Sequence, residues 1–336
     1  MLTMRHPVIA VTDFVFPNLD PAREVLAKVD GELILAEDST RDAVMRVAED
    51  ADALLVTYAK VTADMIEQMA RCRIITRFGI GVDNVDIPAA TKAHIVVTRV
   101  PDYCVDEVSD HAMALLLALA RKVPFANSLV QAGRWEMPAV VPIHRLRGSI
   151  LGLVGFGKIP QLVAPKAKAF GLRVISYDPF VAPEVMNRAG VERVDFDGLL
   201  SVSDFISIHT PLLPETRGLF HAGTFRKMKS TAFLINTARG PIVDEEALAR
   251  ALDQGYLAGA ALDVLSQEPP SRSPLSGRDN VILTPHTSFY SAESLVELQR
   301  KAAEDVVRVL SGEAPFYPVN PEALKSRQEP STALNC

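Results

Sequence analysis

Short runs of apolar and β-branched residues alternate with amphipathic stretches along the whole chain. Runs of this kind are typical of strands in a parallel sheet, because helices cover both faces of such a sheet. The first part of the chain contains five of them, at 7–11, 32–36, 53–57, 73–76 and 95–98. Amphipathic segments such as 42–50 and 63–70 lie between them. The pattern predicts a five-stranded α/β unit of the flavodoxin-like kind.

A second set of six runs follows, at 149–154, 173–177, 205–208, 232–236, 259–263 and 281–284. This number of strands, with helices between them, is typical of a nucleotide-binding doubly wound sheet. The amphipathic segment 293–310 follows the last run, and we expect it to return to the first domain. The sequence therefore predicts two Rossmann-like doubly wound parallel-sheet domains. The predicted bounds are 1–99 plus 293–336 for the first domain and 100–292 for the second.

Two segments stand outside this alternation. Residues 106–121 predict a long helix that is apolar on nearly every face, and such a helix is buried. Periodicity leaves two interpretations open: a core helix that joins the domains, or a helix that also packs on a second subunit. The tail after Pro321 has no pattern, and we expect it to be disordered.

Composition narrows the function classes. A chain of 336 residues is too long for one ordinary core, and its net charge of -6 does not favour a nucleic acid or an anionic membrane as partner. The three cysteines are far apart, so we expect neither a disulfide framework nor a metal site. The N-terminus lacks the apolar core of a signal peptide, and no apolar run approaches the roughly 20 residues of a membrane span. We therefore expect a cytoplasmic protein.

The first strand of the second set runs into a glycine-rich turn, Gly155-Phe156-Gly157-Lys158-Ile159, and then a helix. The first glycine permits a tight turn, and the second lets the backbone approach a pyrophosphate at the helix N-terminus. Asp178 ends the next strand, where a carboxylate accepts hydrogen bonds from the adenosine ribose and repels a 2′-phosphate. NAD is thus favoured over NADP.

Two prolines depart from the usual form of this turn. Pro160 replaces the third glycine, which normally allows close packing of the helix on the strand, and Pro165 lies further along the same helix. Proline is tolerated in a first helical turn, whereas a later proline kinks a helix. We expect NAD binding to survive with altered geometry.

Three charged residues follow later strands, at the edge where open α/β sheets bind ligands: Arg239, Glu268 and His286. Hydride transfer to a ketone needs a proton donor at the developing alkoxide, and His286 suits that role. A carboxylate on the other imidazole nitrogen orients the ring and stabilises its protonated form, which gives Glu268 its task. Arg239 can pair with a substrate carboxylate and polarise the carbonyl. An ordinary Glu268–His286 salt bridge is the competing interpretation.

Over residues 5–320 the chain resembles the D-isomer-specific 2-hydroxyacid dehydrogenase family. The resemblance rests on the segment from Arg77 to Asp86, the glycine-rich turn, Asn236 to Gly240, Gly259 to Val264, Gln267-Glu268-Pro269 and Thr284-Pro-His286. It implies an NAD(H)-dependent enzyme that interconverts a small D-2-hydroxy acid and its 2-keto acid. It further implies that the first domain, 1–99 plus 293–336, is the substrate-binding domain, that the second, 100–292, is the NAD-binding domain, and that the active site lies in the cleft between them. It also implies a homodimer formed through the coenzyme domains, which favours the second interpretation of the 106–121 helix.

The resemblance assigns further residues. Arg239, Glu268 and His286 match the catalytic positions. Positions that line NAD are Val108, His209, Thr210, Pro211, Thr216, Thr237 and Ala238, with Asp263 at the nicotinamide carboxamide. Positions that contact the substrate are Arg77, the loop Gly79-Ile80-Gly81 and Phe289.

Within the family, the chain looks most similar to the branch of the C-terminal-binding proteins and the phosphoglycerate dehydrogenases. The segments that look like C-terminal-binding proteins are those around 103–110, 168–171, 177–179 and 285–291. The C-terminal-binding-protein branch includes transcriptional corepressors that sense NAD(H). An NAD(H)-sensing, corepressor-like scaffold is therefore the alternative to a metabolic enzyme.

Overall fold

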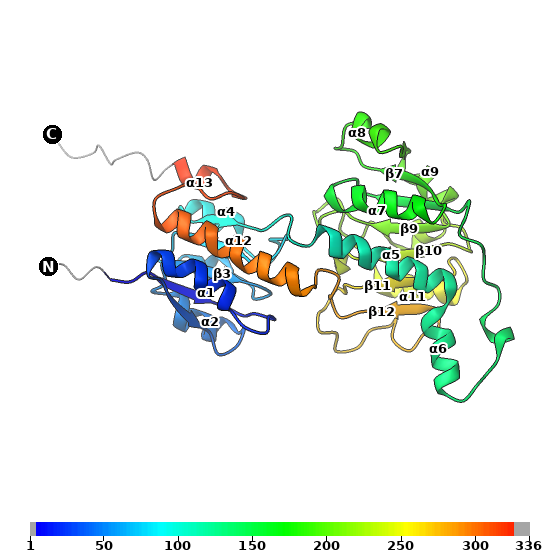
Figure 1. The fold of residues 1–336 in the computed structure, drawn as a ribbon, viewed down its shortest axis with the longest axis horizontal. Coiled ribbons are helices and arrows are strands. Elements are labelled where there is room, and N and C mark those ends of the chain that lie inside the picture. The colour runs from blue at the N-terminus through cyan, green and yellow to red at the C-terminus, as the bar shows by residue number, and fades with distance from the viewer. Residues whose placement is uncertain (1–4, 326–336) are drawn as a thin grey trace. The chain divides into compact units, whose positions relative to one another are not determined.

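A computed structural model describes residues 5–325 of the chain. The chain divides into two compact units: unit 1 is built from the two chain ends, Met1–Tyr103 and Ser291–Cys336, and unit 2 is Cys104–Tyr290. The corresponding bounds predicted from the sequence are 1–99 with 293–336 and 100–292. Figure 1 draws both units, and each is described here by itself.

Unit 1 contains a five-stranded sheet in the order β2-β1-β3-β4-β5, and all of its paired strands are parallel. This is the flavodoxin-like order that the sequence predicts. The strands are β1 (Val8–Val11), β2 (Glu32–Leu35), β3 (Ala53–Val56), β4 (Ile74–Arg77) and β5 (Val96–Thr98). The helices are α1 (Asp20–Leu26), α2 (Arg41–Ala48), α3 (Ala63–Ile66), α4 (Ile87–Lys92), α12 (Ala292–Leu310) and α13 (Glu322–Lys325), with the 3-10 helix η1 (Ala27–Val29).

The long helix α12 completes the core of unit 1 from the far end of the chain. Its start is fixed by a capping box in which Ser291 and Ser294 exchange hydrogen bonds. Its buried face, which includes Leu298 and Val306, packs against α1 and β4, and Figure 1 shows α12 running alongside α1. The prediction of a patternless tail after Pro321 is wrong for residues 322–325, because they form α13. For residues 326–336 that prediction lies outside the described part of the chain.

Unit 2 contains a seven-stranded parallel sheet in the order β12-β11-β10-β9-β6-β7-β8. The six predicted strands are β6 (Ile150–Val154), β7 (Arg173–Tyr177), β9 (Phe205–Ile208), β10 (Phe233–Asn236), β11 (Gly259–Leu262) and β12 (Val281–Leu283). The sequence misses β8 (Glu192–Arg193), because two exposed residues carry no hydrophobic period. The helices are α5 (Val105–Arg121), α6 (Val123–Gln131), α7 (Lys158–Ala169), α8 (Pro183–Arg188), α9 (Phe196–Val202), α10 (Ala222–Phe225) and α11 (Glu245–Asp253), with the 3-10 helices η2 (Met137–Val140) and η3 (Gly240–Ile242).

Helix α5 is a core helix of unit 2. Most of its apolar side chains are buried, and it packs against α7, β10 and β11; Figure 1 shows α5 and α7 side by side. Helix α7 continues through Pro165, and Pro160 is buried in its first turn. No single helix in residues 5–325 is long and apolar enough to cross a membrane, although the bent pair of α5 and α6 would pass on length and composition.

The strand order of unit 2 reverses at β6, which pairs with β7 on one side and β9 on the other. In open α/β sheets, ligands bind at the carboxyl ends of the strands beside such a switch point. Gly155 follows β6 there and has a φ of 97°. A Cβ at this position would lie 2.9 Å from the carbonyl oxygen of His209, so only glycine allows the two strand ends to approach this closely.

Candidate active site

The carboxyl edge of the unit 2 sheet gathers the predicted cofactor and catalytic residues from successive strands. The parallel arrangement places on this one edge the residues after β6 (Gly155), β7 (Asp178), β9 (His209 to Pro211), β10 (Thr237 to Arg239), β11 (Asp263) and β12 (Thr284 to His286). Val108 lies in the first turns of α5 and is buried. The sequence order therefore assembles one site in space.

The glycine-rich turn fits a pyrophosphate. A Cβ on Gly157 would meet no atom within 4 Å, so open space lies above the backbone where the turn becomes the N-terminus of α7. Gly157 is the N-cap and caps the helix with no side chain, which leaves the first N–H groups for an anion. Lys158 is exposed in this first turn, whereas Phe156 is fully buried and Ile159 half-buried.

Two hydroxyl groups at the same edge are buried without a hydrogen-bond partner, namely Oγ1 of Thr210 and Oγ1 of Thr237. Native proteins satisfy most buried polar groups, so an unpaired hydroxyl points to a ligand or water that completes it. Both threonines are predicted to line NAD. Thr216 has a different local role, because its hydroxyl holds the 211–216 turn through the carbonyl of Pro211 at 2.6 Å and the N–H of Leu213 at 2.8 Å.

Asp178 ties the glycine-rich turn to the end of β7. Its Oδ2 accepts the N–H of Phe156 at 2.8 Å, while Oδ1 accepts the N–H groups of Phe180 and Val181 at 2.8 and 3.0 Å. The carboxylate thus shapes the turn as well as the predicted ribose position. A carboxylate offers about four acceptor positions, so one remains for a ribose hydroxyl.

His209 lies at the switch point and is neutral at physiological pH. Its Nε2 is 2.8 Å from the hydroxyl oxygen of Ser207. The residue keeps some solvent contact, but its ring lies deep among protein atoms, and this burial lowers the pKa of His209 to about 3. His209 therefore contributes shape and hydrogen bonding at the cofactor edge rather than positive charge.

Glu268 and His286 are in direct contact, as the sequence predicts. Nδ1 of His286 lies 2.6 Å from Oε2 of Glu268, and the other carboxylate oxygen accepts the N–H of Leu265 at 2.8 Å. The imidazole side chain is 21% exposed and the carboxylate 32% exposed, so both reach solvent or a ligand. The ring of Phe289 stands edge-on to the imidazole at 6.0 Å. Because Nδ1 is held by the carboxylate, Nε2 is the nitrogen through which the ring would exchange a proton.

Arg239 follows β10 on a segment that packs closely against the segment before Glu268. Asn236 holds the turn, accepting the N–H of Ala238 at 3.0 Å and donating to the carbonyl of Arg239 at 2.9 Å. The guanidinium of Arg239 donates to the carbonyl of Ala238 at 2.8 Å. A Cβ on Gly240 would lie only 1.9 Å from the carbonyl carbon of Leu265, so the two backbones are nearly in contact.

Asp263 holds the loop that carries His286. Its Oδ1 accepts the hydroxyl of Thr284 at 2.5 Å and the N–H of Thr287 at 2.9 Å, and Oδ2 accepts the N–H of Ser288 at 2.9 Å. Its backbone carbonyl accepts the N–H of His286 at 2.8 Å. Burial acts to raise the pKa of this carboxyl, but the hydrogen bonds from Thr284, Ser288 and Thr287 outweigh it and lower the pKa.

The Asp263 side chain is fully buried and ionised, and it organises the loop. The contact with a nicotinamide carboxamide that the resemblance assigns to it stays a prediction.

In unit 1 the predicted substrate loop follows β4. Arg77 is buried; its Nη1 donates to the carbonyl of Phe78, and its guanidinium lies 5.8 Å from the ring of Tyr58. Gly79 has a φ of 151°, and a Cβ there would overlap that guanidinium, so the arginine lies against the loop backbone. The N–H of Gly79 already donates to the carbonyl of Arg77 at 2.9 Å. Within residues 5–325, the N–H groups of Ile80 and Gly81 have no such partner and are the donors left for a carboxylate.

Comparison with known proteins agrees with this geometry. Residues 113–288 match the model of the NAD binding domain of D-isomer specific 2-hydroxyacid dehydrogenases. The chain is 39% identical over 300 residues to a glyoxylate reductase of Thermofilum pendens, covering 86% of this chain and 87% of that protein. The chain belongs to the D-isomer specific 2-hydroxyacid dehydrogenase family.

Other family members extend the comparison. The chain is 40% identical over 314 residues to the D-3-phosphoglycerate dehydrogenase of Methanocaldococcus jannaschii, covering 93% of this chain and 59% of that protein. It spans little more than half the length of the D-3-phosphoglycerate dehydrogenases that it matches. A crystal structure of D-lactate dehydrogenase from Aquifex aeolicus with NAD and lactic acid superposes with a TM-score of 0.83 at 28% identity, covering 95% of this chain and 98% of that one.

These findings confirm the predicted family, its phosphoglycerate dehydrogenase-like branch, the fold class and NAD as cofactor. They do not support the C-terminal-binding-protein branch, since the relatives named above are dehydrogenases and a reductase.

Two residues near the site, Glu245 and His111, were not predicted from the sequence. The carboxylate of Glu245 accepts the N–H of Ser266 at 2.5 Å and so braces the segment before Glu268. His111 on α5 reaches Thr284 at 3.1 Å. The only signal for His111 in the sequence is a polar residue inside an apolar helix, which by itself predicts no partner.

Proposed function

We propose that this chain is an NAD(H)-dependent dehydrogenase that interconverts a small D-2-hydroxy acid and its 2-keto acid. The observation that carries the proposal is the Glu268–His286 pair, held at 2.6 Å on the same sheet edge as the glycine-rich turn. An acid–base group beside a nicotinamide site is what reversible reduction of a carbonyl requires.

The residues of this chain have distinct tasks in such a reaction. Bound NADH supplies the hydride for reduction, and bound NAD accepts it in oxidation. In reduction His286 donates a proton from Nε2 to the developing alkoxide oxygen, and in oxidation it accepts the hydroxyl proton. Glu268 holds Nδ1–H in both directions, which fixes the ring orientation and stabilises the imidazolium.

Arg239 is proposed to pair with the substrate carboxylate and to polarise the carbonyl, because a guanidinium offers a planar fork of donors. On unit 1, the N–H groups of Ile80 and Gly81 are proposed to bind a substrate carboxylate. The packing of Phe289 against His286 supports an aromatic contact with the substrate.

The remaining predicted contacts are proposals of the same kind. Those with the substrate are Arg77 and Gly79. Those with NAD are Val108, Gly155, Phe156, Gly157, Lys158, Ile159, Asp178, His209, Thr210, Pro211, Thr216, Thr237, Ala238 and Asp263.

A panel of 2-keto acids tests the function. The names of the relatives make glyoxylate, pyruvate and 3-phosphohydroxypyruvate the first compounds to assay with NADH, with D- and L-2-hydroxy acids and NAD for the reverse direction. We expect turnover of at least one 2-keto acid and oxidation of the D-isomer only. His286→Ala should abolish most turnover while NADH binding persists. Absence of turnover across the panel, with NADH bound normally, would overturn the assignment.

The corepressor-like scaffold has no observation in its favour beyond the segments that suggested it. It predicts NADH binding without turnover, so the same panel separates it from the enzyme.

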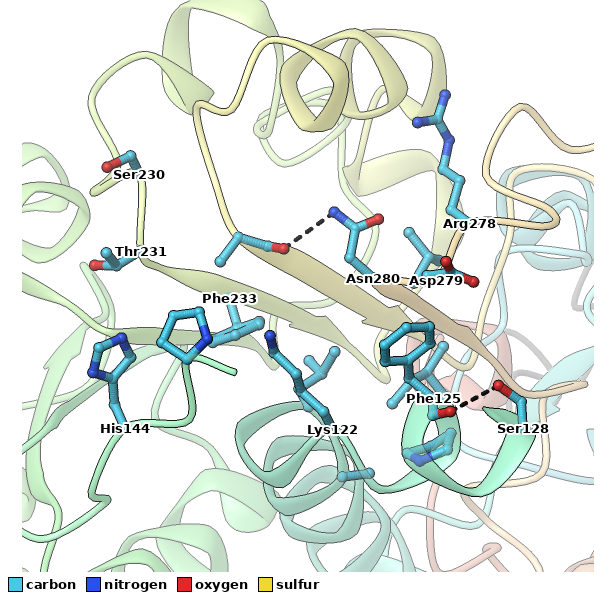
Figure 2. Close-up of a pocket in the computed structure, with 17 residues that line it drawn as sticks. Lys122, Phe125, Ser128, His144, Ser230, Thr231, Phe233, Arg278, Asp279 and Asn280 are labelled. Carbon is cyan, nitrogen blue, oxygen red and sulfur yellow. Dashed lines mark hydrogen bonds between the residues drawn. The ribbon is translucent and has the colours of Figure 1, made fainter. Parts of the chain in front are cut away.

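We also propose that the chain forms a homodimer through unit 2. Several large apolar side chains between residues 123 and 141 are exposed, above all Trp135 at 89% and Met137 at 71%. A cavity of about 500 Å³ opens beside the same segment, with Phe125, Leu119 and Ile282 in its wall. In Figure 2, His144, Ser230 and Thr231 lie along one side of it, and Arg278 and Asn280 along the other. Clustered exposed apolar groups next to an apolar cavity support association with a second copy.

Light scattering after size exclusion tests the dimer. Trp135→Glu should give a monomer, whereas Phe170→Glu, which changes an exposed aromatic elsewhere in unit 2, should leave the assembly unchanged. A wild-type monomer at micromolar concentration would refute the proposal.

We propose the cytoplasm as the location of the protein. The three cysteines, Cys72, Cys104 and Cys336, are far apart in the sequence and form no CxxC pair, which supports a reducing compartment. Recovery of the native protein from a purely secreted fraction would contradict this.

A further inference from the structure

His111 is a half-buried polar residue on a helix that is otherwise packed into the core of unit 2. Its side chain is 24% exposed, and its Nε2 lies 3.1 Å from Oγ1 of Thr284 and 3.6 Å from Oδ1 of Asp263. None of the roles described above uses this imidazole. Of its neighbours, however, Thr284 belongs to the loop that carries His286, and Asp263 binds that loop.

The direction of the hydrogen bonds follows from the chemistry of the three groups. The ionised carboxylate of Asp263 can only accept, so the Thr284 hydroxyl, 2.5 Å away, donates its proton to Oδ1. The remaining lone pairs of that hydroxyl then accept, and the group that faces them is Nε2 of His111. His111 therefore carries a proton on Nε2, and a directed chain runs from His111 through Thr284 to Asp263.

Asp263, at the end of this chain of hydrogen bonds, holds the backbone around His286. Asp263 receives the N–H groups of three successive residues: His286 on its carbonyl, and Thr287 and Ser288 on its carboxylate. His286 itself has a φ of 53°, in the left-handed region that side chains other than glycine rarely adopt. Such a backbone persists only where its surroundings hold it in place.

We propose that His111 is a positioning residue for proton transfer by His286. Through Thr284 it fixes Asp263, and Asp263 holds residues 286–288 in the conformation that presents the imidazole to Glu268. Helix α5 thereby provides a rigid support for the acid–base pair. This inference rests on the proposed dehydrogenase function and adds a residue that the acid–base assignment does not contain.

Two matched pairs of variants test it. His111→Leu removes the donor at similar volume, whereas His111→Gln keeps an N–H at similar reach. Thr284→Val removes the hydroxyl, whereas Thr284→Ser keeps it. Asp110→Asn is the control on the same helix, because Asp110 is exposed and its carboxylate pairs with Lys166, at 2.5 Å, rather than with Thr284 or Asp263.

The kinetic expectation separates positioning from general damage. His111→Leu and Thr284→Val should lower kcat roughly 10- to 100-fold, since small misplacements of a reacting group have effects of this size. The Kd for NADH should stay within about threefold, and His111→Gln and Thr284→Ser should restore most of the activity. In a Glu268→Gln background, His111→Leu should lose less than about threefold, because the pair that it positions is already broken.

A second readout needs neither cofactor nor turnover. Amide hydrogen exchange at residues 286–288 should accelerate at least about tenfold in His111→Leu and Thr284→Val, and remain unchanged in Asp110→Asn. This measurement tests His111 even if the wild type turns over no 2-keto acid, a result that would refute only the proposed function. The inference would be overturned if His111→Leu and Thr284→Val both kept the wild-type kcat and the wild-type rate of amide exchange. It would also be overturned if His111→Leu lowered kcat by the same factor in the Glu268→Gln background as in the wild type. If His111→Leu does not fold, the Thr284 pair decides.

Discussion

Replacing Glu268 by glutamine is the sharpest test of the acid–base pair, because the two carboxylate oxygens have different partners. Oε1 accepts the N–H of Leu265 at 2.8 Å, and Oε2 contacts Nδ1 of His286 at 2.6 Å. Glutamine puts one oxygen and one NH₂ group in these two places. If the oxygen stays with Leu265, the NH₂ group faces Nδ1 and donates to it.

With the glutamine NH₂ group on Nδ1, His286 is held in the neutral form that carries its proton on Nε2. An Nδ1 that accepts a hydrogen bond carries no proton, so the neutral ring is protonated on Nε2 and cannot become imidazolium without losing the bond. Reduction needs an imidazolium that can give up a proton, and oxidation needs Nε2 without one. The other orientation of the amide keeps Nδ1–H bonded but sets two donors, NH₂ and Leu265 N–H, against each other.

The expected loss can be bracketed. A hydrogen bond to a charged group contributes about 1.5–3 kcal/mol, which corresponds to roughly 10- to 100-fold in rate. Carboxylate-to-amide replacement next to a catalytic histidine in serine proteases lowers kcat about 10⁴-fold through the wrong tautomer. We therefore expect kcat to fall about 10²- to 10⁴-fold in both directions.

The assay is steady-state NADH oxidation with the best 2-keto acid, together with NAD reduction by the matching hydroxy acid. NADH affinity is measured separately by fluorescence and should be unchanged, since Glu268 lies outside the glycine-rich turn. Glu246→Gln, on the exposed face of α11, is the control and should behave as wild type. If Glu268→Gln retained kcat within threefold in both directions, the pair would be a plain salt bridge and the mechanism would be wrong.

Three further outcomes are expected. Gly240→Ala places a Cβ 1.9 Å from backbone carbon of Leu265, so the Arg239 and Glu268 segments must separate by more than 1 Å; kcat/KM should fall on the order of 100-fold, and an unchanged value would contradict the close packing. Burial lowers the pKa of His209 to about 3, so this imidazole stays neutral in the folded protein at pH 5, whereas in the unfolded chain it binds a proton below about pH 6.5. The free energy of unfolding should therefore drop by at most about 2 kcal/mol from pH 8 to pH 5. In urea titrations, the free energy of unfolding of His209→Gln should change less between pH 8 and pH 5 than that of the wild type, by this amount. An equal change in both proteins would refute the assignment of this pH dependence to His209. Asp178→Ser should narrow an NADH preference over NADPH of at least about tenfold, measured as the ratio of Kd values; equal wild-type affinities would remove Asp178 from the ribose site.

Most strands were predictable because they are short runs of apolar residues, and several, such as β1, β3, β4 and β9, are buried along their whole length. The Glu268–His286 contact was predictable for a related reason: the carboxyl ends of parallel strands share one edge, so residues after β11 and β12 meet there. Strand β8 was not predictable, since Glu192 and Arg193 have no apolar signal.

The rest of the site depends on tertiary proximity that no local pattern encodes. His111 meets Thr284 only because α5 packs on β11, and the sequence between them gives no sign of that contact. The left-handed backbone of His286 is likewise unexpected for a histidine, because its propensity alone would place it elsewhere. In the loop of unit 1, the N–H of Gly79 bonds to the carbonyl of Arg77, a local contact that no pattern in the sequence predicts.

The construction of unit 1 from both chain ends has a consequence for biosynthesis. The apolar face of α1 is covered by α12, and α12 leaves the ribosome only after the whole of unit 2 has been made. At usual rates of translation the nascent first segment waits about 10 to 40 s for this partner. Unit 2 is continuous and can fold during that interval, whereas the unfinished sheet of unit 1 exposes apolar surface. A premature stop before Ser291 would thus leave a folded coenzyme unit joined to an incomplete partner, a natural target for chaperones and proteases.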